Sequence, residues 1–363
     1  MKVIISLGHP AHFHLFRNMA TALLEHGHSV KFVLTEKDIL VQLLNEYSFD
    51  YEILAKRKNN ETFVDKLMKV LKSTKKLYDI VDSFRPNVMI GCISQMAWVG
   101  FVKSVPTIFC GEDDFDYTYL QGLITYPFVS FICAPKETNI GPFKRKKIAY
   151  NGYQKLAYLH PNVFVPDYNK LGGIDVNQPF FILRLVNLVA HHDVNIKGLN
   201  GDLIDQIVKK LEKRGVVYIS SEKELSKDLQ KYKLPINVKY IHHAMAFSNL
   251  FLGDSQSMAV EASMLGVPNI RYNDFAGKIN VLNEIENHYG LTNSLGTKYP
   301  QKLLDLIDSL LDEQNLKESY QLKRNKMLND KIDVTAFFVW FIENYPESAR
   351  IMKENPDYQY NFR

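Results

Sequence analysis

The sequence predicts an α/β protein with two doubly wound domains, each built on a parallel sheet with helices on both faces. The chain has 363 residues, more than twice the roughly 150 of an average domain. In both halves, short apolar runs alternate with longer segments of helical periodicity, which is the pattern of parallel βαβ units. A polar stretch rich in Pro and Gly, residues 161–178, separates the halves and is predicted to be a linker.

The first half, residues 1–160, is predicted to form the N-terminal domain. Its strand-like segments are short and almost wholly apolar, as expected for strands buried on both faces. The predicted strands are 3–6, 30–34, 51–54, 88–90, 106–109 and 129–133. The predicted helices are 13–24, capped by Gly27, then 38–47, and 63–84, which ends before Pro86.

The second half, residues 179–345, shows the same alternation and is predicted to form the C-terminal domain. The predicted strands are 180–186, 216–220, 238–241, 250–252 and 269–271. The predicted helices are 203–213, 255–265, 303–311 and 334–342. Residues 346–363 form a polar tail, which we expect to pack back on the N-terminal domain. Two such domains predict a cleft between them, with ligands at the carboxyl ends of the strands.

Composition excludes several classes of protein. Lys and Arg exceed Asp and Glu by 44 to 40, and this net charge of +4 is too small to suggest a nucleic-acid partner. The three cysteines, Cys92, Cys110 and Cys133, lie in apolar runs and are expected to be buried and reduced. The sequence shows no signal-peptide pattern and no apolar run of about 18 residues, so we expect a cytoplasmic protein.

The first predicted strand runs into a loop with glycine and three histidines, Gly8-His9-Pro10-Ala11-His12-Phe13-His14. It is not the dinucleotide fingerprint G-x-G-x-x-G. Gly8 permits a tight backbone turn, and His9 and His12 stand where a general base or a phosphate ligand would face the cleft. The alternative is that these histidines cap and pack the helix. His9 and His12 have the H-x-x-H spacing of zinc ligands, but no nearby Cys or carboxylate completes a set, so no metal is expected.

A second candidate site lies where residues 250–252 lead into the helix predicted at 255–265. The backbone N–H groups of Ser255, Gln256 and Ser257, together with the helix dipole, suit a diphosphate. Asp254, Ser257 and Glu261 are spaced to share one stripe, and Glu261 could accept two hydrogen bonds from a ribose diol. The alternatives are a capped helix with Glu261 in solvent, or a nucleophilic serine, although Ser257 replaces the last glycine of G-x-S-x-G.

The remaining donor-side candidates are charged groups and histidines in the second half. Arg184 lies in an apolar strand and needs a partner, either a carboxylate of the protein or a phosphate of a ligand. His191-His192-Asp193 follow that strand, and of these we select His192 as a donor ligand. His242 follows the strand predicted at 238–241 and either contacts a base or caps a helix. Lys278 is a candidate phosphate contact near a helix start, or a surface lysine.

The N-terminal half contributes candidate acids and a basic surface. Glu112 and Asp113 follow the strand predicted at 106–109 and are candidates for general-base work, with a solvated loop as the alternative. Lysines of the 63–84 helix and the basic runs 56–58 and 144–147, with Phe and Tyr nearby, suggest peripheral contact with an anionic membrane. The alternative is an ordinary solvated helix face.

Several of these stretches resemble the two-domain GT-B superfamily, whose domains are Rossmann-like. His12, followed by a helix ending at Gly27 and by His28, resembles the first loop and helix of MurG-type glycosyltransferases. Residues 254–262 with 265–268 are similar to the donor-site helix of non-hydrolysing UDP-GlcNAc 2-epimerases. That resemblance puts the ribose-binding glutamate at Glu261 and the phosphate-binding loop at 255–258.

The whole chain looks like the DUF354 family. The matching strings are Gly8-His9-Pro10-Ala11-His12, Ala190-His191-His192-Asp193, Ile219-Ser220-Ser221-Glu222 and Gly277-Lys278-Ile279. The chain departs from the epimerases and transferases at Gln256 and Ser257, where paired glycines are usual. It also lacks the epimerase aspartate after the fourth strand and the H-R-R-E-N string, and both absences weigh against epimerisation.

The resemblance implies a metal-independent, nucleotide-sugar-dependent glycosyltransferase of glycan or cell-envelope polysaccharide synthesis, without a cofactor. The second domain would bind the nucleoside diphosphate sugar, and the first a sugar or lipid-linked acceptor. His12, or else Glu112 or Asp113, would accept the acceptor's proton, while Arg184 and Lys278 would neutralise the leaving diphosphate. The alternatives are a sugar-nucleotide epimerase or hydrolase on the same scaffold, and a non-catalytic sugar-nucleotide-binding protein.

Overall fold

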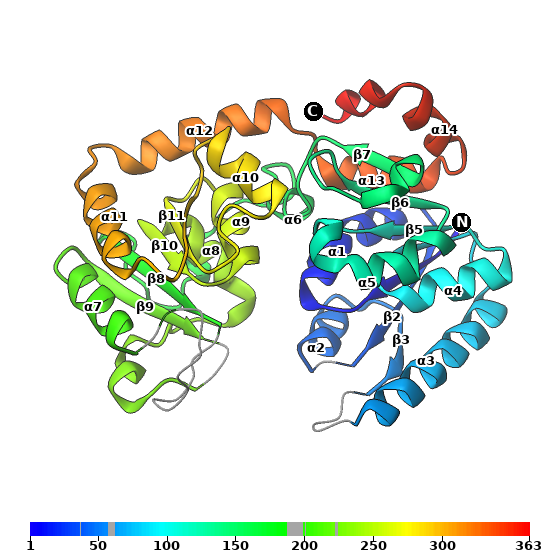
Figure 1. Ribbon diagram of the computed structural model, residues 1–363, viewed down its shortest axis with the longest axis horizontal. Helices are drawn as coiled ribbons and strands as arrows, with labels where there is room; N and C mark the ends of the chain where they lie inside the picture. Colours follow the sequence, from blue (N-terminus) through cyan, green and yellow to red (C-terminus); the bar gives the residue numbers. More distant parts are fainter. Residues whose placement is uncertain (37, 57–61, 187–198, 200, 222–223) are drawn as a thin grey trace. The chain divides into compact units, whose positions relative to one another are not determined.

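The computed structural model describes the chain apart from residues 37, 57–61, 187–198, 200 and 222–223 (Figure 1). The chain divides into two units. Unit 1 comprises Met1–Val163 with Lys331–Arg363, and unit 2 comprises Phe164–Asp330. Residues 331–345, which the prediction placed in the second domain, therefore belong to unit 1.

Unit 1 is built on a seven-stranded parallel sheet in the order β3-β2-β1-β4-β5-β6-β7. Its strands are β1 (Lys2–Leu7), β2 (Ser29–Thr35), β3 (Tyr51–Ala55), β4 (Val88–Gly91), β5 (Thr107–Cys110), β6 (Phe131–Pro135) and β7 (Lys147–Tyr150). The first six match the predicted strands. β7 was not predicted, because only its alternate residues Ile148 and Tyr150 are buried and a basic run leads into it.

The strand order reverses between β1 and β4, and this decides where the helices lie. Right-handed connections place α1 and α2 on one face of the sheet and α3, α4 and α5 on the other. Leu77 and Val81 of α3 pack with Met96 and Val99 of α4 over the strands. The helices are α1 (Pro10–Glu25), α2 (Asp38–Glu46), α3 (Phe63–Phe84), α4 (Ser94–Lys103), α5 (Phe115–Thr125) and α6 (Leu156–Leu159), with 3₁₀ turns η1 (Tyr126–Phe128) and η2 (Gly141–Lys146).

The C-terminal segment completes unit 1. It contains α13 (Val334–Glu343), α14 (Glu347–Glu354) and the 3₁₀ turn η6 (Pro356–Phe362). Phe338 of α13 is fully buried and stacks on Phe16 of α1, and the hydroxyl of Thr335 donates to the carbonyl of Ala157 in α6. The apolar face of α13 thus covers α1 rather than unit 2, which is why the boundary falls at Asp330.

Unit 2 has a five-stranded parallel sheet in the order β12-β11-β10-β8-β9. Its strands are β8 (Phe180–Leu185), β9 (Val216–Ser221), β10 (Leu250–Gly253), β11 (Asn269–Tyr272) and β12 (Asn293–Leu295). Its helices are α7 (Gly201–Leu211), α8 (Ile241–Phe247), α9 (Gln256–Met264), α10 (Asn280–Asn287), α11 (Pro300–Asp312) and α12 (Leu316–Asp330), with 3₁₀ turns η3 (Tyr168–Lys170), η4 (Lys227–Tyr232) and η5 (Val238–Tyr240). The strand order reverses between β8 and β10.

The strand predicted at residues 238–241 is wrong. The side chain of Asn237 accepts a hydrogen bond from the N–H of Lys239, which begins a 3₁₀ turn that leads directly into α8. A capping side chain overrides the weak strand preference of a four-residue apolar run. Most of the predicted linker, residues 164–178, folds as part of unit 2, where Nδ1 of His243 accepts a hydrogen bond from the N–H of Asp167 (3.0 Å).

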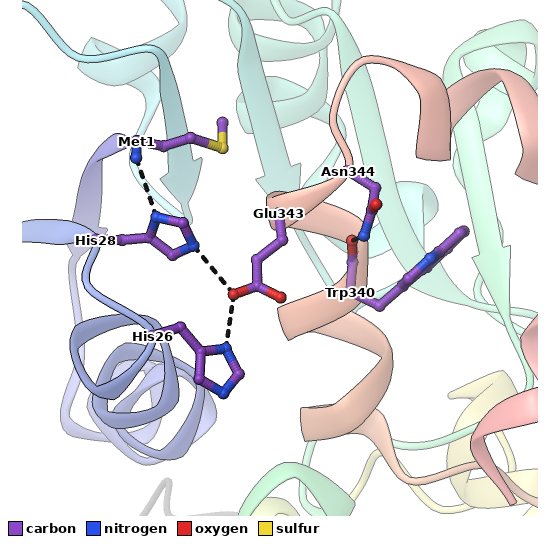
Figure 2. Close-up of polar contacts among 6 residues, drawn as sticks. All are labelled: Met1, His26, His28, Trp340, Glu343 and Asn344. Carbon is purple, nitrogen blue, oxygen red and sulfur yellow. Dashed lines mark hydrogen bonds and ion pairs between the residues drawn. The ribbon is translucent and has the colours of Figure 1, made fainter.

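A carboxylate joins the C-terminal segment to the start of unit 1 (Figure 2). One oxygen of Glu343, Oε1, lies 2.7 Å from Nδ1 of His26 and 3.0 Å from Nε2 of His28. Nδ1 of His28 in turn lies 3.0 Å from the amino group of Met1. The Glu343 side chain is only a quarter exposed, so these bonds are partly shielded from water.

We expect Glu343→Ala to lower the free energy of unfolding of unit 1 by about 1–2 kcal/mol, because two partly shielded hydrogen bonds to a charged group are lost. The measurement is urea unfolding followed by tryptophan fluorescence, since both tryptophans, Trp98 and Trp340, lie in unit 1. Glu354→Ala, on the exposed face of α14, is the control and should cost much less. Equal losses in the two variants would contradict a bridging role for Glu343.

Candidate functional site

The loop after β1 lies where the strand order of unit 1 reverses, the place where doubly wound sheets bind ligands. His9 is the N-cap of α1, and its Nδ1 accepts a hydrogen bond from the N–H of Ala11 (3.2 Å). Gly91, the last residue of β4, is in register with Ser6 of β1. A Cβ on Gly91 would lie 2.0 Å from the Ser6 hydroxyl oxygen, so only glycine fits there.

His12 is held by the same loop. Its Nδ1 accepts a hydrogen bond from the N–H of Gly8 at 3.1 Å, and the ring is half-buried. An Nδ1 that accepts a hydrogen bond places the proton of a neutral imidazole on Nε2. A neutral His12 in this arrangement is a hydrogen-bond donor at Nε2, and its Nδ1 is occupied by the N–H of Gly8.

The zinc alternative gains no support from this geometry. The rings of His9 and His12 meet edge to face with centroids 6.1 Å apart, and each Nδ1 accepts a backbone hydrogen bond. Across the part of the chain that the structure describes, no three His, Cys, Asp or Glu side chains are arranged to hold a metal ion.

The two acidic candidates after β5 have different surroundings. Both oxygens of Glu112 are engaged, Oε1 by the N–H of Gln154 (3.0 Å) and Oε2 by the ammonium group of Lys155. Both members of this ion pair are about nine-tenths buried. Glu112 therefore fixes the turn before α6 to the carboxyl edge of the sheet, and its charge is compensated by a lysine that the sequence analysis did not single out.

Asp113 projects from the same edge into solvent. Partial burial of its carboxyl group, with the nearby negative charges of Glu112 and Asp114, raises its pKa above the ordinary value, against the opposing effect of Lys155. Asp114 is buried, and its Oδ1 accepts a hydrogen bond from the N–H of Asn139 (2.7 Å). Asp113 is thus the carboxylate of this group best placed to accept a proton.

The raised pKa of Asp113 predicts a pH-dependent stability effect. A carboxyl group whose pKa is higher in the folded state disfavours folding once it is ionised, so the penalty is present near neutral pH and absent below the unfolded pKa. We therefore expect Asp113→Asn to be more stable than wild type at pH 7. The advantage should disappear as the pH falls below about 4. Urea unfolding across this range measures it, and a constant difference at every pH would contradict the assignment.

In unit 2 the candidate donor site lies where the strand order reverses between β8 and β10. Gly253, the last residue of β10, is in register with Arg184 of β8, and a Cβ on Gly253 would lie 2.8 Å from both Cβ and O of Arg184. Asp254 follows, and its Oδ1 accepts a hydrogen bond from the N–H of Val186 (2.9 Å). Asp254 precedes α9, so it braces the two strand ends and does not share a helix stripe with Glu261.

The predicted phosphate-binding residues form the start of α9. Ser255 is the N-cap, and its hydroxyl accepts a hydrogen bond from the N–H of Met258 at 3.3 Å. Gln256 and Ser257 are the first two helical residues and are half-buried. Their N–H groups have no intrahelical acceptor, as at every helix N-terminus, and the helix dipole favours an anion beside them.

Glu261 is buried and is not on a solvated face. Its Oε2 lies 3.3 Å from Nε2 of His242, in the first turn of α8, and both side chains are less than a tenth exposed. The structure thus brings together two residues predicted separately as donor ligands. His242 is inside the helix rather than at its cap, since Tyr240 is the N-cap of α8.

The cationic candidates are dispersed. Nη1 of Arg184 donates to the hydroxyl of Ser220 on β9 at 2.8 Å, so a serine is one partner of this arginine. Lys278 is exposed and precedes α10, with its ammonium group 5.9 Å from the ring centroid of Phe275. His192 lies outside the described residues.

The sequence analysis missed a buried cation beside the donor loop. Arg271 of β11 is in register with Gly253, is fully buried, and donates from Nε and Nη2 to the hydroxyl of Ser294. Burial lowers its pKa to about 10, against the opposing effect of Glu286. An arginine within a short, fully buried strand is the signal that could have identified it.

Comparison with solved structures identifies the fold. S. aureus MnaA, solved with UDP, matches with a TM-score of 0.70 and 16% identity over 96% of this chain and 97% of that one. UDP-GlcNAc 2-epimerase from Neisseria meningitidis, solved with UDP-GlcNAc, gives 0.63 and 15% over 98% and 99%. MurG from Acinetobacter baumannii gives 0.61 and 14% over 94% and 99%. The two Rossmann-like sheets are therefore those of the GT-B fold, as predicted.

The family follows from the sequence. The model of the family described as "Protein of unknown function (DUF354)" matches residues 1–279, more than half of the chain, and the chain belongs to that family. No curated protein matches the chain. Among the helices that the structure describes, none is long and apolar enough to cross a membrane.

Proposed function

We propose that this protein is a nucleotide-sugar-dependent glycosyltransferase, which binds its donor through unit 2. The observation that carries the proposal is the arrangement at the reversal point of the unit 2 sheet. There the N-terminus of α9, at Ser255–Ser257, begins directly after β10, and Glu261 is buried one to two turns further along the same helix. An anion site followed by a fixed carboxylate matches a diphosphate joined to a ribose.

His242 gives Glu261 a defined orientation. The imidazole 3.3 Å from Oε2 holds this buried carboxylate in place, and a carboxylate at this position would accept hydrogen bonds from a ribose hydroxyl. The N–H groups of Gln256 and Ser257 would bind the diphosphate, and Arg184 and Lys278 would add positive charge as the leaving group departs. The solved neighbours that contain UDP or UDP-GlcNAc are consistent with this class of ligand.

Unit 1 would bind the acceptor, a sugar or a lipid-linked saccharide. Among the predicted catalytic residues we assign proton acceptance to Asp113, because Glu112 is neutralised by Lys155 and His12 carries its proton on Nε2. The raised pKa of Asp113 makes it a stronger base than an ordinary carboxylate. His12 would then donate a hydrogen bond to a bound oxygen, and the process we envisage is glycan or cell-envelope polysaccharide synthesis.

A sugar-nucleotide epimerase or hydrolase is the second candidate, because MnaA has a higher TM-score than MurG. Epimerisation needs acid and base groups at the sugar itself. The loop after β4, Cys92-Ile93-Ser94, supplies no carboxylate there. Release of a free sugar or an altered sugar nucleotide without any acceptor would select this candidate.

The donor site predicts selective binding of one nucleoside diphosphate. At a ligand concentration of about 100 times the dissociation constant, binding should stabilise the protein by roughly 2.7 kcal/mol. Thermal unfolding is measured with UDP, GDP, CDP and their sugars. We expect a shift with one base, and its loss in Glu261→Gln, which keeps the shape of the side chain but removes its charge.

Glu318→Gln, an exposed carboxylate of α12, is the matched control and should keep the shift. Melting of Glu261→Gln without ligand shows whether the variant folds. Absence of a shift with every nucleotide in the wild-type protein would refute the donor site. Binding without turnover on any acceptor would instead indicate a non-catalytic sugar-nucleotide-binding protein.

Once the donor is known, variants of Asp113 and Glu112 distinguish a loss of catalysis from a loss of stability. Asp113→Asn should lower kcat by about 10²–10⁴-fold with the fold intact, because the proton acceptor is lost. Glu112→Gln should instead lower the free energy of unfolding by about 3 kcal/mol, because Lys155 is left buried and uncompensated. Asp116→Asn, an exposed carboxylate of α5, should change neither. Full activity of Asp113→Asn would return the role to His12.

A further inference from the structure

Unit 1 exposes large apolar side chains on three neighbouring elements, α4, α5 and η1. Phe101 of α4 and Leu120 of α5 are each 63% exposed. The rings of Phe101 and Phe128 meet edge to face at 5.5 Å, and the indole N–H of Trp98, one turn before Phe101, donates to the carbonyl of Ile124. We define the apolar face as Phe101, Val102, Leu120, Leu123, Ile124 and Phe128.

A hollow of about 290 Å³ opens within this face. Phe101, Pro127 and Phe128 line its apolar side, and Ser104, Ser130 and Lys146 its polar side. It lies where β5 and β6 begin, at the edge of the sheet opposite to the candidate site after β1 and β5. The apolar face is therefore separate from the residues assigned to catalysis.

Lys146 supplies a fixed cation in the hollow. Its ammonium group donates to the carbonyls of Tyr126, Pro127 and Val129, at 3.1, 2.7 and 2.8 Å. Burial lowers its pKa below the ordinary value. Within the described chain, no ion pair joins a carboxylate to this ammonium group, so its positive charge is balanced only by carbonyl dipoles.

Basic residues outnumber acidic ones in the elements that carry or adjoin the apolar face, where Lys103 of α4 is paired with Asp82 of α3. Lys144 and Arg145 of η2 are exposed and precede Lys146 in the chain. Helix α4 contains no acidic residue. Helix α5 contains one, Asp116, which lies in its first turn, at the end of the helix away from η1. Exposed apolar side chains with a basic margin are complementary to an anionic lipid surface, where acyl chains and phosphates lie side by side.

We propose that the apolar face binds an anionic phospholipid bilayer. Its aromatic and aliphatic side chains would enter the boundary between headgroups and acyl chains, and the exposed Lys144 and Arg145 would contact lipid phosphates. This surface differs from the basic surface predicted from the sequence, which included all of residues 144–147 and the run 56–58. Lys147 of the 144–147 run is turned inward onto the carbonyls of Lys136 and Thr138, and Arg57 and Lys58 lie outside the described residues.

Co-sedimentation of the purified full-length protein with vesicles tests the proposal. We expect binding to vesicles of phosphatidylcholine with phosphatidylglycerol, and weaker binding to phosphatidylcholine alone. The double variant Phe101→Ser/Leu123→Ser should lower binding at least tenfold, because two apolar side chains no longer enter the bilayer. Lys144→Ala/Arg145→Ala should lower binding to the anionic vesicles by about 30-fold and leave binding to phosphatidylcholine unchanged.

The control is Val165→Ser/Leu322→Ser, which removes two apolar side chains of unit 2 that are more exposed than Phe101 and Leu123. It should bind vesicles as the wild type does. Failure of the wild type to bind either vesicle, or equal loss in the control variant, would overturn the proposal. So would a change of oligomeric state in Phe101→Ser/Leu123→Ser without any vesicle binding, since the face would then be a contact between copies of the chain. None of these readouts depends on nucleotide binding or glycosyl transfer.

Discussion

The close approach of two parallel strands at each reversal point is the constraint on which both candidate sites depend. In unit 1, Gly91 of β4 leaves no room for a side chain beside Ser6 of β1. In unit 2, Gly253 of β10 stands in the same relation to Arg184 of β8. In each sheet the chains leave this pair of strands in opposite directions, which opens the edge where a ligand can approach backbone groups.

The loops at these edges differ in what they offer a ligand. After β1, two backbone N–H groups of the loop are used within the loop itself. The N–H of Ala11 donates to Nδ1 of His9, and the N–H of Gly8 donates to Nδ1 of His12. After β10, Ser255 caps Met258 and leaves the first turn of α9 for an anion. The asymmetry is consistent with the proposed division, in which unit 2 binds the donor and unit 1 the acceptor.

The sequence was sufficient to predict the strand alternation and the start of α9 at Ser255, because these depend on local apolar periodicity and on helix-start residues. The GT-B fold was predicted from the resemblance of several stretches to that superfamily. It was insufficient where a long-range partner decides the outcome. Nothing near Glu343 or Phe338 indicates that their helix packs on α1 rather than on unit 2. Likewise, Glu112 and Asp113 are adjacent acids that look alike in the sequence. They differ in the structure because Lys155, 43 residues away, forms an ion pair with Glu112, whereas Asp113 is exposed.

Helix α5 connects the two proposals for unit 1. It begins directly after Asp113 and Asp114, and its second half carries Leu120, Leu123 and Ile124 of the apolar face. The helix is kinked at Thr118, where the backbone is not helical. A bilayer on the apolar face would then lie about one short helix from the proposed proton acceptor. If both proposals hold, an acceptor anchored in that bilayer would have to extend past α5 to bring its hydroxyl group to Asp113.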